Sequence, residues 1–159
     1  MMALRHLIRH RLCLGFWRRE EGAVLAEALV VVPFVTLFAA GILEFGNIFW
    51  ERMQIDAGLR DAGRYWSRCR QSPTYTSYCT EDIARKIAFY GSPIPPTGTP
   101  LRVPGWGPGT AALDISPIST NGTITVETSH LYQTSPLFGW LGIDTITINS
   151  SHEERYIGW

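Results

Sequence analysis

The chain has 159 residues, which is the size of one ordinary domain. Its 14 basic and 14 acidic side chains give a formal charge of zero, which argues against non-specific nucleic-acid binding because that needs a basic surface. With 45% hydrophobic and 18% charged residues, the chain is also too apolar for a disordered tail.

The charges are unevenly distributed along the chain. Residues 1–22 hold five arginines and two glutamates, a net charge of +3. The other 137 residues hold nine basic and twelve acidic side chains, a net charge of −3. A basic head, an apolar run and a mildly acidic body are typical of a membrane-anchored protein rather than of a soluble enzyme.

The apolar run covers residues 23–43 (AVLAEALVVVPFVTLFAAGIL) and contains one charged side chain, Glu27. At a helical rise of about 1.5 Å per residue, the run spans roughly 31 Å, which is close to the hydrocarbon thickness of a bilayer. It therefore predicts a transmembrane helix, which Pro33 is expected to bend without breaking.

The flanking charges predict the orientation of this helix. Five arginines precede the run, whereas only Arg52 and Arg60 follow it at a comparable distance. The positive-inside rule then gives a basic cytoplasmic leader (1–22), a transmembrane helix (23–43) and an external domain (44–159). The alternative is a cleaved secretory signal that ends at residues 39–41 (AAG), but the apolar run is longer than such a signal needs.

The junction at residues 18–27 (RREEGAVLAE) joins a charged stretch to the apolar run through Gly22. It resembles the processing site of type IV pilins and pseudopilins, in which a membrane-embedded prepilin peptidase cuts after the glycine. The resemblance implies cleavage between Gly22 and Ala23, so that Glu27 becomes the fifth residue of the mature chain.

The carboxylate of Glu27 needs a physical explanation of its own. An ionisable group costs about 2.5–3.5 kcal/mol in the middle of a bilayer, and less near the interface, so it is kept where it finds a partner. Cleavage would expose an α-amine on Ala23, with which Glu27 of a neighbouring subunit can pair. In the alternative interpretation, the side chain reaches back to the cytoplasmic headgroups and serves no function.

Two further segments support a narrower resemblance. Residues 41–47 (GILEFGN) and 54–65 (QIDAGLRDAGRY) are similar to the TadE-like family, the pseudopilins of the Tad (tight adherence, or Flp pilus) apparatus. The similarity extends from Arg18 to about Tyr65.

This resemblance implies an α+β pilin-like fold, in which a long N-terminal helix packs on a small antiparallel sheet. It implies a minor pilin or pseudopilin of the bacterial inner membrane, with a periplasmic C-terminal domain. The implied partners are other pilin-like subunits, the Tad machinery, a prepilin peptidase and membrane lipid. Neither an enzymatic activity nor a cofactor is implied.

Helical periodicity continues beyond the apolar run, from Glu44 to about Cys69, and predicts one rod of roughly 45 residues. Glu44 is expected to mark the edge of the bilayer. Gly58 and Gly63 either allow close approach of another surface or are local weaknesses of the helix. The apolar positions expected to form one face are Phe45, Phe49, Met53, Leu59, Ala62, Tyr65 and Trp66.

The cysteines divide by compartment under this topology. Cys13 would lie on the reducing side as a free thiol, whereas Cys69 and Cys79 would lie outside. A bridge between the latter two closes a short loop and is worth on the order of 3 kcal/mol. Two unpaired thiols are the alternative.

A second helix is predicted from Thr80 to Tyr90, with Thr80 as its N-cap and Gly91 as its stop. Residues 91–112 contain six prolines and five glycines, which predicts an irregular loop. Trp106 in this loop is either part of an exposed patch or packed beneath the loop.

The remaining chain alternates polar and apolar residues, which predicts antiparallel strands. Asn121-Gly122 predicts a two-residue hairpin loop between the first two strands, and Pro117 makes the first an edge strand. Residues 137–141 (LFGWL) are either a lid on the core or a contact surface. The predicted strands are Leu113–Thr120, Thr123–Tyr132 and Asp144–Ser151.

Catalytic motifs are not found in the sequence: it has no G-x-S-x-G, no H-E-x-x-H and no phosphate-binding loop. His130 and His152 fall on different predicted strands without a carboxylate or cysteine cluster beside them, so we interpret both as solvated or structural. We therefore expect no catalytic, metal or cofactor site.

The sequence is compatible with three functions. The first is a TadE-like pseudopilin. The second is an uncleaved single-pass anchor that displays a periplasmic binding or scaffold domain. The third, a secreted hydrolase, is disfavoured because the sequence offers no nucleophile and base.

Overall fold

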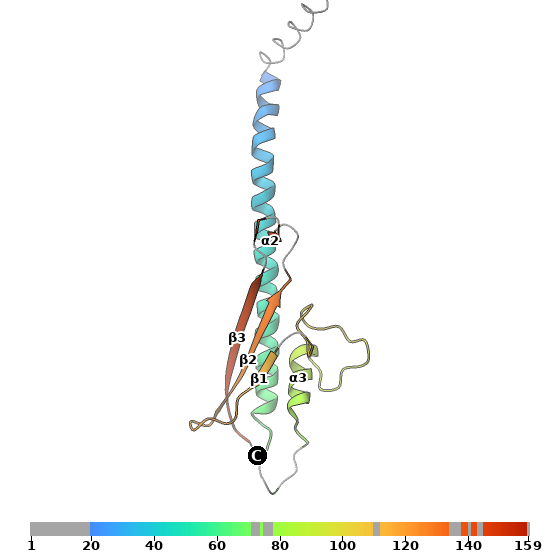
Figure 1. The fold of residues 1–159 in the computed structure, drawn as a ribbon, viewed down its shortest axis with the longest axis vertical. Coiled ribbons are helices and arrows are strands. Elements are labelled where there is room, and N and C mark those ends of the chain that lie inside the picture. The colour runs from blue at the N-terminus through green and yellow to red at the C-terminus, as the bar shows by residue number, and fades with distance from the viewer. Residues whose placement is uncertain are drawn as a thin grey trace, which may run out of the picture. The chain divides into compact units, whose positions relative to one another are not determined.

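The computed structural model describes residues 20–70, 74, 78–109, 112–133, 138–139, 141–142 and 145–158. Cys13 and most of the predicted leader lie outside these residues. The elements in chain order are α2 (Glu20–Trp66), α3 (Glu81–Tyr90), β1 (Ala112–Ile115), β2 (Thr123–Tyr132) and β3 (Ile146–Arg155) (Figure 1). One long apolar helix and a three-stranded antiparallel sheet confirm the predicted α+β class.

The chain divides into two units, Met1–Glu44 and Phe45–Trp159. In the first unit, α2 is apolar on all sides, and none of the most apolar 18-residue stretch is buried within the protein. Pro33 lies inside the helix without ending it, and the Thr36 hydroxyl donates to the Pro33 carbonyl (2.9 Å). The helix is long and apolar enough to cross a membrane.

In the second unit, α2 buries one stripe of side chains. Ile55, Leu59 and Ala62 on this stripe have no exposed surface. They pack with residues of β2, β3 and α3 in one hydrophobic core, and Figure 1 shows α2 flanked by the sheet and by α3.

The prediction that Phe45, Phe49 and Met53 share the face of Leu59 and Ala62 was wrong. Phe45, Phe49 and Met53 are at least half exposed, whereas Leu59 and Ala62 are fully buried. At about 100° per residue, the centre of the first set lies roughly 110° around the helix axis from the centre of the second, so the core covers one set and leaves the other exposed.

The sheet has the order β1-β2-β3, with β2 in the centre. Alternate side chains of β2 point toward the core, as its burial pattern shows. The predicted bounds of β2 are confirmed, while β3 starts two residues later than predicted and runs four residues further.

The connection between β1 and β2 differs from the predicted two-residue loop. Strand β1 ends at Ile115 instead of Thr120, before Pro117, which has no N–H to give to a ladder. The chain then closes a three-residue loop, because Ser119 N–H donates to Thr123 O (2.8 Å) and Gly122 N–H donates to Ser119 O (2.9 Å). Gly122 has φ +73°, the left-handed conformation that such loops require at their last position.

Helix α3 is capped as predicted. The Thr80 hydroxyl accepts from Ile83 N–H (3.2 Å), and Gly91 N–H donates to Ile87 O (2.9 Å) at φ +74°. These caps satisfy backbone groups at both ends of a helix of only ten residues.

Trp106 is packed beneath the loop and has no exposed surface. Its ring meets Phe89 of α3 edge to face at 4.9 Å, and its indole N–H donates to Thr128 of β2 (3.0 Å). Gly58 of α2 makes room for it, since a Cβ there would lie 2.7 Å from the Trp106 ring. Gly58 is therefore a position of close approach rather than a local weakness.

Candidate functional site

The first candidate site is on α2 near the predicted edge of the leader. Gly22 and Ala23 both lie on this helix, close to the N-terminal end of its described part. Glu27 follows on the same helix, about 7.5 Å along the axis from Gly22. The structure thus places the three predicted residues on one short helical segment.

The surroundings of Glu27 are apolar. Its side chain is exposed, and its helical neighbours Val24, Val30 and Val31 are also exposed, at 65%, 58% and 47%. Within the described part of the chain, no hydrogen bond or ion pair of the Glu27 carboxylate is found. A carboxylate on such a surface can bind a cation presented by another molecule.

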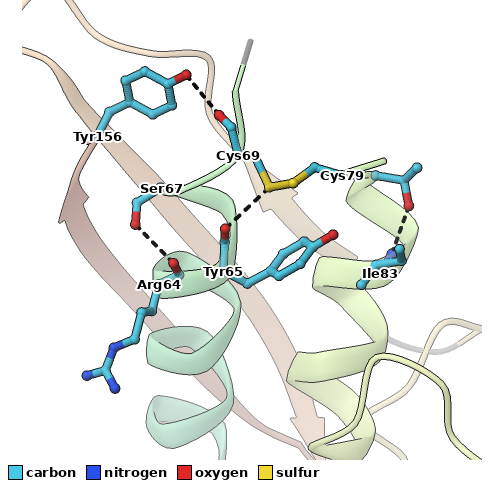
Figure 2. The surroundings of a disulfide bond; sticks show 8 residues. Arg64, Tyr65, Ser67, Cys69, Cys79, Ile83 and Tyr156 are labelled. Carbon is cyan, nitrogen blue, oxygen red and sulfur yellow. Dashed lines mark hydrogen bonds between the residues drawn. A yellow bond between two sulfur atoms is a disulfide. The ribbon is translucent and has the colours of Figure 1, made fainter. Parts of the chain in front are cut away.

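The second candidate site is the end of α2 at the disulfide. The structure has a bond between Cys69 and Cys79, whose Cα atoms are 5.7 Å apart (Figure 2). The Cys69 sulfur also lies 3.3 Å from the Tyr65 carbonyl oxygen, which is a contact rather than a hydrogen bond because a disulfide sulfur carries no hydrogen. Since Cys79 directly precedes the N-cap Thr80, the disulfide fixes α3 to the end of α2.

The segment after β3 is attached to the same place. The Tyr156 hydroxyl donates to the Cys69 carbonyl (2.8 Å), as Figure 2 shows, and Ile157 N–H donates to the Ser67 carbonyl (3.0 Å). The Ser67 hydroxyl in turn donates to Arg64 O (3.1 Å). This end of the second unit is therefore held by one covalent and several polar contacts.

A third cluster lies inside the second unit, where α2 faces the far half of β2. The carboxylate of Glu51 comes within 3.5 Å of His130 Nε2, and both side chains are buried. One turn earlier, the Asn47 amide donates to the Tyr132 hydroxyl (2.8 Å). Burial lowers the pKa of His130, because the charged imidazolium loses hydration.

The expectation that His130 and His152 have no carboxylate beside them was wrong. His130 has Glu51 across the core, and His152 lies 3.1 Å from Glu154 on its own strand. Residues two apart on a strand share a face, and the second pair was missed because the predicted strand ended at Ser151, four residues before β3 ends.

Glu51 is a core residue that was not predicted, although the sequence contains a signal for it. Its position falls on the same helical stripe as Ile55, Leu59 and Ala62. Glu51 was not assigned to the core because a carboxylate is rarely buried there without a partner.

Comparison with known proteins gives one result. Residues 22–64 match the model of the family described as TadE-like protein, which confirms the resemblance predicted from the sequence. Neither a curated protein nor a solved structure matches the chain. The matched residues all lie on α2.

Proposed function

We propose that this protein is a pseudopilin-type component of a Tad pilus, which acts by associating with other pilin-like subunits and with the pilus machinery. The single observation that carries this proposal is that the TadE-like match coincides with one uninterrupted helix. Within it, the part up to Glu44 exposes apolar side chains in every direction. A helix that is apolar all round is suited to lipid or to other apolar helices.

In this proposal, residues 1–22 form a cytoplasmic leader, 23–43 cross the inner membrane, and 44–159 form the periplasmic domain. Five arginines before the span support that orientation. The disulfide supports it too, because such bonds persist in the oxidising periplasm.

A prepilin peptidase cuts between Gly22 and Ala23 in this proposal. The charged residues directly before the bond, Arg18 to Glu21, support cleavage because they match the prepilin processing site that the sequence resembles. Gly22 also favours cleavage, because glycine is a poor helix former and the helix around the bond opens more easily.

Glu27 then pairs with the α-amine of Ala23 on a neighbouring subunit. The apolar surface around Glu27 favours this role, because a charge pair is stronger where water is excluded. The mature subunit enters the filament or remains at its base.

Mass spectrometry of the protein from its own host tests the proposal. We expect a mature N-terminus at Ala23, and we expect Gly22→Phe to prevent its formation. Gly46→Ala is the matched control, because a Cβ at Gly46 meets nothing within 4 Å. An N-terminus upstream of Gly22 in piliated cells would favour the second candidate, an uncleaved anchor that displays a periplasmic binding or scaffold domain.

A further inference from the structure

The second unit carries an exposed apolar surface at the start of its part of α2. Phe45, Phe49, Trp50 and Met53 are between 50 and 68% exposed, although the neighbouring stripe of the same helix is fully buried. A contiguous group of large exposed apolar side chains marks an interaction site.

A second element adds to this surface. Phe138, in the connection between β2 and β3, is itself buried and meets Phe45 edge to face with ring centroids 6.2 Å apart, which brings this connection to the exposed surface. Leu141 in the same connection is 48% exposed. The hydrogen bond from Asn47 to Tyr132, the last residue of β2, fixes the start of this connection beside α2. We call the following exposed residues the apolar collar: Phe45, Phe49, Trp50 and Leu141.

The sequence position of the collar limits what can cover it. Phe45 follows the last residue of the predicted span, Leu43, by two residues, and Trp50 follows it by seven. At about 1.5 Å per residue these positions rise roughly 3 to 10 Å from the hydrocarbon edge. The headgroup layer is about 5–7 Å thick, and helical side chains tilt toward the N-terminus, which here means toward that layer.

The chemistry of the collar fits a lipid headgroup layer. Tryptophan and other aromatic side chains concentrate there, because they combine an apolar body with a polarisable or hydrogen-bonding edge. Arg52, exposed between Trp50 and Met53 in sequence, adds a cation that can pair with phosphate groups.

We propose that the apolar collar is immersed in the phospholipid headgroup layer of the leaflet on the domain's side. The folded unit then rests on the membrane through α2 and through Leu141 of the β2–β3 connection, rather than being tethered by the helix alone. This inference rests on the proposed membrane anchor, and it adds a lipid contact for the folded domain.

Spin labels on the full chain in vesicles of phosphatidylethanolamine and phosphatidylglycerol test the inference. Labels are attached to Phe49→Cys and Leu141→Cys in a Cys13→Ser background with the disulfide oxidised. Val35→Cys serves as the lipid reference, and Arg60→Cys and Glu127→Cys, both exposed in the second unit, serve as water references. Collision rates with oxygen, which favours lipid, and with an aqueous nickel complex are compared.

We expect positions 49 and 141 to give ratios of oxygen to nickel collisions between those of position 35 and those of positions 60 and 127. Ratios equal to the water references would overturn the inference, while a lipid ratio at position 35 would leave the anchor intact. Low collision rates with both reagents would also overturn it, because they would mean that a second copy covers the collar. A water ratio at position 35 would instead contradict the proposed function.

A second measurement avoids cysteine variants. The fluorescence difference between the unchanged protein and Trp50→Phe isolates Trp50, and the conservative change at an exposed position preserves the fold. We expect this difference signal to be quenched by phospholipids brominated near the headgroup. An unquenched signal would contradict the inference.

Discussion

The two parts of α2 show how one helix meets two kinds of surroundings. Up to Glu44 its apolar side chains are exposed in every direction, whereas from Phe45 to Trp66 one narrow stripe is fully buried and other faces carry charges. Uniform hydrophobicity suits a lipid environment, and periodic hydrophobicity suits a protein core. The change in hydropathy pattern near Glu44 therefore indicates where α2 changes from a uniformly apolar surface to one that packs into a protein core.

The largest expected effect comes from truncating the same residue type in the two parts. We expect Leu59→Ala to lower the free energy of unfolding of the second unit by about 2–5 kcal/mol, because it opens a cavity at a fully buried position. Leu29→Ala, at a position 78% exposed, should change that energy by less than about 0.5 kcal/mol. Denaturant unfolding in detergent, followed by near-UV circular dichroism, measures both changes in free energy. Equal changes would contradict the difference in burial between the two parts of α2.

Removal of the disulfide is the next largest effect. The Cys69→Ser, Cys79→Ser double variant should lose on the order of 3 kcal/mol, because the unfolded chain regains the freedom of the closed loop. The matched Cys13→Ser variant should lose none of this stability. If the double variant unfolded at the same denaturant concentration as the unchanged protein, the disulfide would not contribute to the fold.

Alanine substitutions at two glycines compare a part of the α2 surface that other residues cover with a part that nothing covers. Gly58→Ala should cost about 1–3 kcal/mol, since the new Cβ would lie 2.7 Å from both the Trp106 ring and the Ala88 carbonyl oxygen. Gly46→Ala, with nothing within 4 Å, should be neutral or gain up to about 1 kcal/mol from helix propensity. The same denaturant measurement gives both free energies of unfolding. An increase for Gly58→Ala would contradict the packing of Trp106 against Gly58.

The smallest effect concerns acidification. Burial lowers the folded pKa of His130 below its ordinary value of 6.5, so the unfolded chain binds more protons as the pH falls through that value. Stability is therefore full above this pH and is lost below it, by at most about 1.4 kcal/mol per pH unit. Unfolding measured between about pH 7.5 and 5.5 should show this slope in the unchanged protein and in His152→Gln, but not in His130→Gln. A slope that survives in His130→Gln would assign it to other groups.

Much of the fold could be predicted because its signals are local. The caps of α3 are formed by Thr80 and Gly91 through hydrogen bonds with their own helix. The bounds of β2 follow from the alternation of polar and apolar side chains within ten residues. The residues that match the TadE-like family likewise lie on one continuous stretch.

The contact of greatest structural weight that was missed joins distant parts of the chain. Glu51 and His130 are 79 residues apart in sequence, so only the packing of α2 on β2 brings them together. The exposure of Phe45 and Phe49 was missed for a similar reason, because periodicity does not say which of two apolar sides the sheet will cover.

In the proposed function, the carboxylate of Glu27 joins neighbouring subunits within the membrane. The most direct measurement compares Glu27→Gln with Glu44→Gln, at opposite ends of the predicted span, for N-terminal processing and for recovery of the chain with assembled pili. We predict that both variants are processed to Ala23, and that only Glu27→Gln is lost from the pilus fraction. Normal recovery of Glu27→Gln with assembled pili would contradict the claim.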